Sequence, residues 1–281
     1  MVERNSWSLA AAHVTLFVGS ALILFPIYLV FVAASHEAAD LIGKTPAWFG
    51  TAFLDNLNLV MTQQFESSIG VPVGTMLFNS FVMAFGIAVG KIALALIAAF
   101  SFVYCRFPGR IFCFWLVFVT LMLPVEVRIV PTYAVVAKLD MLNSPAGLIL
   151  PLMASAIGVF MYRQFFLTVS DELLEAALID GAGPWKFFKD IAWPLSRNNT
   201  AALFVVLFIY GWNQFLWPLL VTTQGEMYTI VMSITRMSRD VDSVAHWNLV
   251  MMTAVLAMLP PLLVVVCMQR LFVKGMIDSE K

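Results

Sequence analysis

The sequence predicts an all-α integral membrane protein. Of its 281 residues, 61% are hydrophobic and only 12% are charged, and the mean hydropathy of +0.90 lies far from the balance of ordinary soluble domains. Apolar runs without a charged residue, such as 14–34 and 247–269, reach the roughly 20 helical residues that a bilayer core requires. We therefore predict one transmembrane domain over residues 1–281, with its core at about 76–270 and no soluble domain.

Six apolar segments can be placed along the chain, and each is expected to form one transmembrane helix. Six helices put both termini on the same side of the membrane. Ten of the sixteen Lys and Arg residues then lie on the side of the termini, five lie on the other side, and Lys91 lies within a helix. Because basic residues concentrate on the cytoplasmic side, we predict that both termini are cytoplasmic. The predicted helices cover residues 14–34, 76–104, 111–136, 146–166, 198–221 and 247–270.

The ends of the first helix and the links between helices follow from local composition. Little positive charge precedes the first helix and no small-residue cleavage pattern follows it, so we expect a retained helix and not a removed signal peptide. Pro108 and Gly109, flanked by Arg106 and Arg110, predict a tight cytoplasmic turn. Long loops are expected at 36–75 and 222–246 on the opposite face, where an external partner could bind.

Several kinds of chemistry are disfavoured by the sequence. The three cysteines lack metal-ligand spacing, and the formal net charge of −1 argues against nucleic acid. Residues 86–91 do not form a phosphate loop, and without a Walker A motif ATP hydrolysis is not expected of this chain. An intramembrane enzyme would need a metal or nucleophile cluster, yet all three histidines fall near predicted membrane edges. We predict no catalytic residue, no metal site and no cofactor bound by this chain.

A cytoplasmic loop at about 168–197 carries the most informative pattern. Ser170 can cap a helix that begins with acidic residues and ends at Gly181, and Pro184 can open a second short helix that Pro194 breaks. On spacing alone, an amphipathic link lying on the membrane surface is the favoured interpretation. The apolar stripe of the first helix is expected to contain Leu173, Leu174, Ala177 and Leu178, and Trp185, Phe187, Phe188 and Ile191 are expected to face inward in the second.

The spacing of this loop nevertheless resembles the signature loop of permease subunits of bacterial ABC importers. In that family the loop forms a coupling helix that docks into a groove of a cytoplasmic ATPase. The resemblance implies this ATPase-coupling role for the matching positions and their neighbours, while Trp193 departs from the family's usual Leu. The positions concerned are Glu175, Ala176, Ala177, Asp180, Gly181, Ile191 and Pro194.

The resemblance extends over most of the chain. Residues 208–219 look like the second permease subunit of carbohydrate-type importers, and 121–129, 150–156 and 278–281 are similar to permeases of sn-glycerol-3-phosphate importers. The loop at 36–75 is the least similar part. The family implies a type I permease fold with six helices in a bacterial inner membrane. It also implies a second, different permease subunit, two ATPase subunits that bind ATP and Mg, and a periplasmic substrate-binding protein.

Polar groups within the predicted helices are candidates for the substrate pathway. Lys91 lies in mid-helix, where a charge costs at least about 2.5 kcal/mol on insertion scales. An interhelical ion pair or a snorkelling lysine is as plausible as a pathway role. Glu126 and Arg128 lie between two prolines, either as a surface charge pair or with Arg128 binding a phosphate. Further candidates, which are either interhelical glue or a cavity wall, are Trp212, Asn213 and Gln214.

Taken with the resemblance, these features predict one half of a pore that passes a small polar solute inward while a separate ATPase supplies energy. The expected solute is sn-glycerol-3-phosphate or a glycerophosphodiester, and the alternative within the same class is a neutral sugar or polyol. A less favoured alternative is an ion-coupled secondary transporter, which would be expected to show paired repeats and midplane ion ligands.

Overall fold

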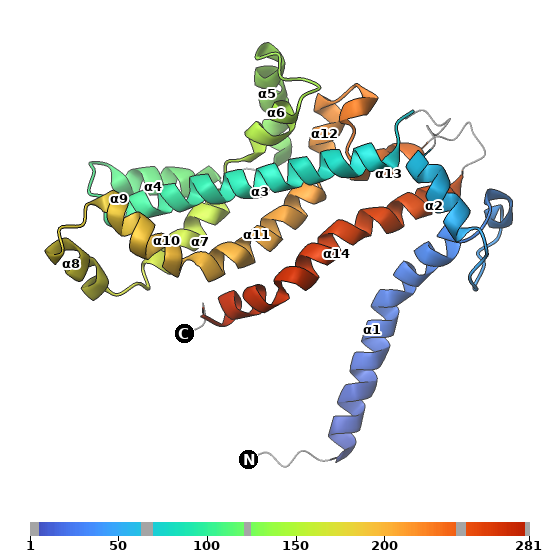
Figure 1. Cartoon of the computed structure of the whole chain (residues 1–281), viewed down its shortest axis with the longest axis horizontal. Coiled ribbons are helices and arrows are strands. Elements are labelled where there is room, and N and C mark those ends of the chain that lie inside the picture. Colours follow the sequence, from blue (N-terminus) through green and yellow to red (C-terminus); the bar gives the residue numbers. More distant parts are fainter. Residues whose placement is uncertain (1–5, 63–69, 121–124, 240–245, 279–281) are drawn as a thin grey trace. The chain divides into compact units, whose positions relative to one another are not determined.

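The computed structural model describes residues 6–62, 70–120, 125–239 and 246–278, and every regular element in those residues is helical (Figure 1). Three helices are long and apolar enough to cross a membrane: α1 (Ser6–Ala34), α3 (Val73–Tyr104) and α14 (Trp247–Asp278). A fourth span can be formed by the pair Pro145–Leu152 and Ala156–Thr168, which is bent by 48°. The all-α membrane fold is confirmed, whereas the count of six spans stays a prediction.

Two of the predicted spans are each observed as a pair of shorter helices. The span at 111–136 corresponds to α4 (Arg110–Val119) and α5 (Val125–Lys138), with residues 121–124 outside the described part. The span at 198–221 corresponds to α11 (Arg197–Trp212) and α12 (Leu216–Val221). The second break has a local cause, because Pro218 lacks an amide hydrogen and its ring excludes the carbonyl four residues earlier.

The chain divides into two compact units. The first contains Met1–Gly74 and Ser233–Met258, and the second contains Thr75–Met232 and Leu259–Lys281. In the first unit, the predicted loop at 36–75 contains two elements, η1 (Ala38–Leu41) and α2 (Phe53–Thr62). The expectation of a plain long loop was therefore too simple.

A buried asparagine ties the first unit together. The Asn56 amide donates to the carbonyl oxygens of Ala34 at 2.9 Å and His36 at 2.8 Å, which satisfies backbone groups at the end of α1. The Asn248 amide at the start of α14 donates to the Asn56 side-chain oxygen at 2.9 Å. Because Asn56 and Asn248 are 3% and 5% exposed, these bonds are shielded from water and fix α2 against both partners.

The second unit is organised around α3, where small residues allow other segments to approach closely. A Cβ at Gly86 would lie 2.8 Å from Ile149 Cδ1, and one at Gly90 would overlap the Met153 side chain. These contacts bring in the bent span, which contains α6 (Pro145–Ile149), η3 (Leu150–Leu152) and α7 (Ala156–Phe166). On α11, a Cβ at Gly211 would lie 2.9 Å from Ala84 Cα. Close helix packing is therefore the observed role of Gly86 and Gly90 on α3 and of Gly211 on α11.

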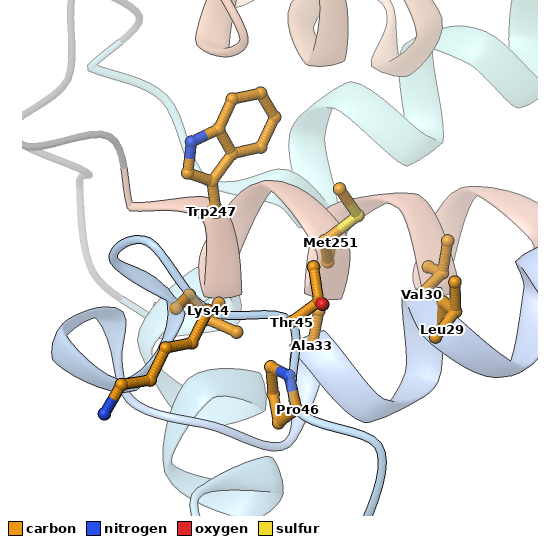
Figure 2. Close-up of a pocket in the computed structure, with 9 residues that line it drawn as sticks. Leu29, Val30, Ala33, Lys44, Thr45, Pro46, Trp247 and Met251 are labelled. Atoms are coloured by element: carbon orange, nitrogen blue, oxygen red, sulfur yellow. The ribbon is translucent and has the colours of Figure 1, made fainter.

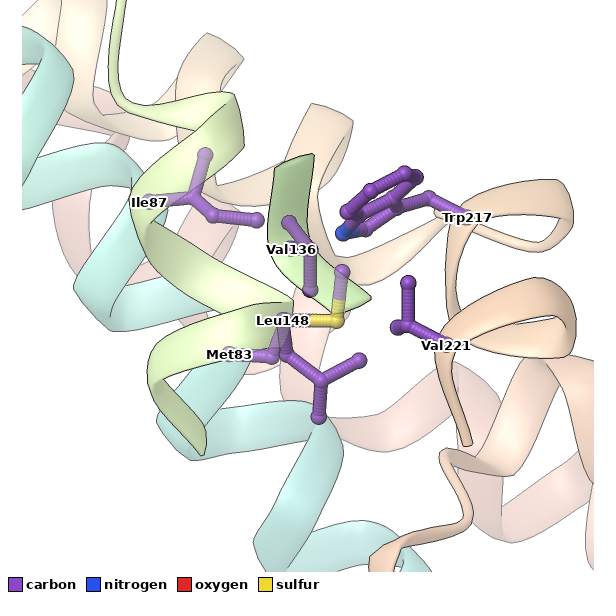
Figure 3. Close-up of a cluster of buried hydrophobic side chains, with 6 residues drawn as sticks. All are labelled: Met83, Ile87, Val136, Leu148, Trp217 and Val221. Atoms are coloured by element: carbon purple, nitrogen blue, oxygen red, sulfur yellow. The ribbon is translucent and has the colours of Figure 1, made fainter. Parts of the chain in front are cut away.

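An apolar cluster in the same unit joins four of these elements. Figure 3 shows side chains from α3, α5, α6 and α12 converging on one point. The indole nitrogen of Trp217 donates to the Gly147 carbonyl at 3.1 Å, so the largest side chain of the cluster also has its polar atom satisfied. The cluster consists of Met83, Ile87, Val136, Leu148, Trp217 and Val221.

The segment that leads into α13 (Ile230–Met237) is fixed to the start of α3 by polar side chains. The Asn79 amide donates to the carbonyls of Glu226 at 2.6 Å and Tyr228 at 3.1 Å, which lie in and just after η5 (Gly225–Met227). At the next residue, the Ser80 hydroxyl accepts from the Ile230 amide at 2.7 Å. The last predicted loop is therefore structured on its described N-terminal side.

Candidate functional site

The predicted cytoplasmic loop folds as two short helices joined by a tight turn. The first helix, α8, covers Asp171–Ile179, and the second begins with α9 at Pro184–Phe187. Ser170 occupies the N-cap position of α8, but its side chain makes no capping hydrogen bond. Pro184 stands at the first position of α9, where its missing amide hydrogen costs nothing. The predicted helix pair is thus confirmed, but the capping hydrogen bond expected from Ser170 is not observed.

Gly181 closes α8 with a left-handed turn. Its φ is +69°, a conformation that residues with a Cβ adopt at a cost. The amide of Gly181 donates to the Leu178 carbonyl at 3.1 Å, and the amide of Ala182 donates to the Ala177 carbonyl at 2.8 Å. These two bonds form a Schellman motif, which satisfies carbonyls that the helix end would leave free. The glycine of the signature therefore has a conformational reason.

α9 and the residue after it, Phe188, are held against the C-terminal end of α3 by aromatic side chains. Phe187 is 3% exposed, and its ring centroid lies 5.0 Å from that of Tyr104. Phe188 lies 5.0 Å from Phe100 in an edge-to-face arrangement. The Tyr104 hydroxyl also donates to the Phe166 carbonyl at 3.2 Å, which adds the end of α7 to the same junction. The loop is therefore anchored to two membrane helices.

The structure corrects the expected break at Pro194. After α9 the chain continues through a π-helical turn, η4 (Phe188–Ala192), into α10 (Trp193–Leu195), and α11 begins two residues later at Arg197. Pro194 is inside α10, and Ala192 and Ser196 on either side have right-handed helical dihedrals. A π turn widens the helix just before the proline, which relieves the clash of its ring with the preceding turn. Ile191 lies in this widened turn and is half-buried.

Several apolar residues of the loop are exposed where the sequence placed them inside. Of the predicted stripe on α8, Ala177 is buried and Leu174 half-buried, while Leu173 and Leu178 are 41% and 62% exposed. Trp185 was expected to face inward and is 70% exposed. Glu175, Ala176 and Asp180 are also exposed. Figure 1 shows α8 beyond the end of α3 within the second unit. The loop thus presents largely exposed apolar side chains, one of which, Trp185, also stacks on Phe188 with ring centroids 5.3 Å apart.

Lys91 lies in a tight environment formed by three segments of the second unit. Its side chain is 8% exposed. The ammonium donates to the Ala154 carbonyl at 3.4 Å and lies 4.5 Å from the centre of the Tyr210 ring. No carboxylate among the described side chains pairs with it; the side chain of Glu126 lies outside that part, so the interhelical ion pair stays an untested alternative. Sequence reasoning missed Tyr210 and Ala154. Pro151 and Ser155 are the signal that could have indicated the break before α7, where the Ala154 carbonyl is free to accept from Lys91.

Arg128 is exposed on α5, and its charge is close enough to Lys91 for the two to repel one another. The backbone of Glu126 is also in α5, but its side chain lies outside the described residues. Because α5 is helical from Val125 through Pro131, the broken backbone that a Glu126–Arg128 pair requires is not observed. Of the predicted pathway residues, Lys91 and Arg128 are therefore close enough to act on each other electrostatically.

The other three pathway candidates are the last residue of α11 and the two residues that follow it. Trp212 is 3% exposed and stacks on Phe208 with ring centroids 5.9 Å apart, which places it in the core. The Asn213 amide donates to the Ile209 carbonyl at 3.0 Å, and the Gln214 amide donates to the Tyr210 carbonyl at 3.1 Å. Both amides therefore satisfy carbonyls of their own helix. Their pathway role stays a prediction.

The first unit contains an apolar cavity of about 240 Å³ (Figure 2). It lies between the last turns of α1, the segment at 41–46 and the first turn of α14, and no predicted site residue lines it. Within the described residues, no group of three or more His, Cys, Asp or Glu could hold a metal ion.

Comparison with known proteins gives consistent results. The model of a family described as "binding-protein-dependent transport system inner membrane component" matches residues 91–278. The whole chain is similar to the sn-glycerol-3-phosphate transport system permease protein UgpE of Rhizobium meliloti (strain 1021), with 49% identity over 282 residues. Proteins of the same name from Brucella melitensis and Escherichia coli O1:K1 / APEC are 50% and 49% identical, and every alignment covers 100% of both chains.

A solved structure shares the fold. It is the crystal structure of a bacterial ABC transporter involved in the import of the acidic polysaccharide alginate, and the TM-score is 0.79. The similarity covers 93% of this chain and 95% of that one at 16% sequence identity. At such a low identity the match supports the arrangement of helices alone.

Proposed function

Since this chain belongs to the family of binding-protein-dependent transport system inner membrane components, we propose that it forms one half of the membrane pathway of an ATP-driven importer. The single observation that carries the coupling role is the loop of α8 and α9. It is anchored on α3 through Phe187 and Phe188, and it keeps large apolar side chains mostly exposed. Such side chains are suited to a protein groove, since aromatic anchors dominate the energy of protein interfaces.

The same geometry suggests how force reaches the membrane helices. An ATPase that closes on ATP would push on α8 and α9, and the aromatic junction would transmit this displacement to α3 and α7. The coupling residues in this proposal are Glu175, Ala176, Ala177, Asp180, Gly181, Ile191 and Pro194. ATP and Mg bind to the partner, and this chain is not itself an enzyme.

The proposed assembly contains a second, different permease subunit, two copies of the ATPase and a periplasmic substrate-binding protein. The chain is a multi-pass protein of the bacterial inner membrane, and the proposal places both termini in the cytoplasm. This orientation puts the α8–α9 loop on the same side as the ATPase, in agreement with the ten basic residues assigned to that side.

We propose sn-glycerol-3-phosphate or a glycerophosphodiester as the solute. The support is the name of relatives that are 49–50% identical over their full length, together with the positive charges of Lys91 and Arg128, which are close enough to act on each other. The competing solute is a neutral sugar or polyol, which the same fold could carry. An ion-coupled secondary transporter is disfavoured because the loop has no purpose without an external motor.

The test is uptake of radiolabelled solute into proteoliposomes that contain this chain with its neighbouring permease, ATPase and binding subunits. We expect accumulation of glycerol-3-phosphate that requires ATP, and no accumulation of a neutral disaccharide. Preference for the disaccharide would refute the phosphate assignment, and uptake without ATP would refute the importer.

A further inference from the structure

Lys91 carries a positive charge that no described side chain around it balances. It lies near the middle of α3, which is otherwise uncharged from Val73 to Tyr104. The described residues within reach of its ammonium supply a backbone carbonyl and an aromatic ring, both of which are neutral. A charged side chain inside the membrane that faces protein and lacks a counter-charge is typical of a substrate or ion pathway.

Among the described residues, the ammonium is also short of hydrogen bonds. It has three N–H donors, and its bond to the Ala154 oxygen at 3.4 Å is longer than the usual 2.7–3.2 Å range. The Tyr210 ring, at 4.5 Å, provides a cation–π contact on a second side. A strong acceptor would therefore improve the environment of Lys91 without displacing a short hydrogen bond.

The neighbourhood contains a second cation and a break in a helix. Arg128 adds positive charge near Lys91, so the local field favours an anion. Ala154 lies in the non-helical segment between η3 and α7, where the span bends by 48°. In transporters, binding sites commonly lie where membrane helices are interrupted near the midplane. Three independent segments, α3, this break and α11, thus meet at the ammonium.

We propose that Lys91 is the residue of this subunit that binds the phosphate of the translocated solute, and that Tyr210 is a positioning residue that holds its ammonium ready. The inference rests on the proposed function and identifies one contact between this subunit and the transported solute. The phosphate oxygens accept hydrogen bonds from the ammonium, with Arg128 adding long-range attraction. The class of ligand is a phosphate monoester or diester. Tyr210 acts through Lys91, because it contacts the ammonium with the face of its ring and that face has no hydrogen-bond donor to offer the solute.

A purely structural role for Lys91 makes a different prediction. In that case the ammonium would serve to satisfy the Ala154 carbonyl that the helix break leaves free. A glutamine at position 91 still offers an N–H donor to this carbonyl but carries no charge, whereas an arginine keeps the charge. The pair Lys91→Gln and Lys91→Arg therefore separates the two roles.

The experiment uses the complete complex in proteoliposomes with saturating loaded binding protein, and it measures glycerol-3-phosphate uptake and ATP hydrolysis in parallel. For Lys91→Gln we expect about tenfold or more loss of uptake per ATP hydrolysed, since a hydrogen bond to a charged group contributes about 1.5–3 kcal/mol, and 1.4 kcal/mol is tenfold. Lys91→Arg should stay within about threefold of the wild type. The exposed Lys138, changed to Gln, is the matched control and should have no effect.

Tyr210 gives a second, independent test if the Lys91→Gln complex does not assemble. Tyr210→Phe keeps the ring face and should transport like the wild type, whereas Tyr210→Leu should lose roughly two- to thirtyfold, the range of a cation–π contact. Normal uptake by Lys91→Gln would overturn the inference, and so would normal uptake by Tyr210→Leu where the Lys91→Gln complex does not assemble. If the wild-type complex itself accumulated no phosphate ester, the proposed function would fail instead, so the two failures are distinguishable.

Discussion

Replacing Gly181 tests whether the turn after α8 matters for coupling. At φ +69° a residue with a Cβ pays about 1–2 kcal/mol, and a Cβ at this position would meet no atom within 4 Å. The whole cost of Gly181→Ala is therefore conformational, and it should lower the population of the closed turn about five- to thirtyfold relative to open conformers. Asparagine tolerates this conformation better than alanine, and a β-branched residue tolerates it worse.

The assay is amide hydrogen exchange at positions 181 and 182, whose N–H groups donate to Leu178 and Ala177. Exchange should speed up in the order glycine, asparagine, alanine, valine, by about the factor given above for alanine. In the assembled complex, uptake per ATP hydrolysed should fall in the same order. If alanine exchanged as slowly as glycine, or if asparagine were as damaging as valine, the conformational explanation would be refuted.

Three further predictions concern other contacts. Asn56→Ala leaves two backbone carbonyls and the Asn248 amide without their partner. We therefore expect the free energy of unfolding, measured by thermal unfolding of the purified chain, to fall by about 2 kcal/mol or more. Asn58→Ala, at an exposed position, is the control, and equal melting temperatures of the two variants would contradict the prediction. Gly90→Ala should destabilise by about 1–3 kcal/mol through overlap with Met153. A second change, Met153→Ala, should restore stability, and failure to do so would show that crowding is not the cause. Trp185→Ala should leave the melting temperature of the chain unchanged but weaken its binding to the ATPase by about thirtyfold, because an interface anchor that contributes about 2 kcal/mol is lost. If the ATPase still co-purified unchanged, Trp185 would not be part of the proposed interface.

In the coupling loop, the sequence predicts the features that depend on local backbone preferences. A glycine after an apolar helix and a proline before the next one specify the turn through their own dihedral preferences, and Gly181 and Pro184 are where these rules place them. The orientation of Trp185 could not be predicted. Which side of α9 faces inward is decided by Phe100 and Tyr104, which are far away in the sequence. The helix around Pro194 could not be predicted either, because it depends on a π turn that no residue type indicates.

The membrane helices show a similar division. Apolar content predicted where helices lie, because burial in lipid requires it over about 20 residues. It could not predict continuity, since the breaks at 153–155 and 213–215 lie within apolar stretches and depend on single residues such as Pro218. The partners of Lys91 were equally out of reach: Ala154 and Tyr210 meet it only through the packing of three segments.

The unbroken course of the chain from Pro184 through η4 and α10 towards α11 has a mechanical consequence. A flexible link at Pro194 would absorb movement of the loop, whereas a nearly continuous rod acts as a lever, so that torque applied at α9 turns the near end of α11. Spin labels on exposed sites of α9 and early α11 should therefore keep a constant separation through the ATP cycle, while distances from α9 to the far ends of the membrane helices change.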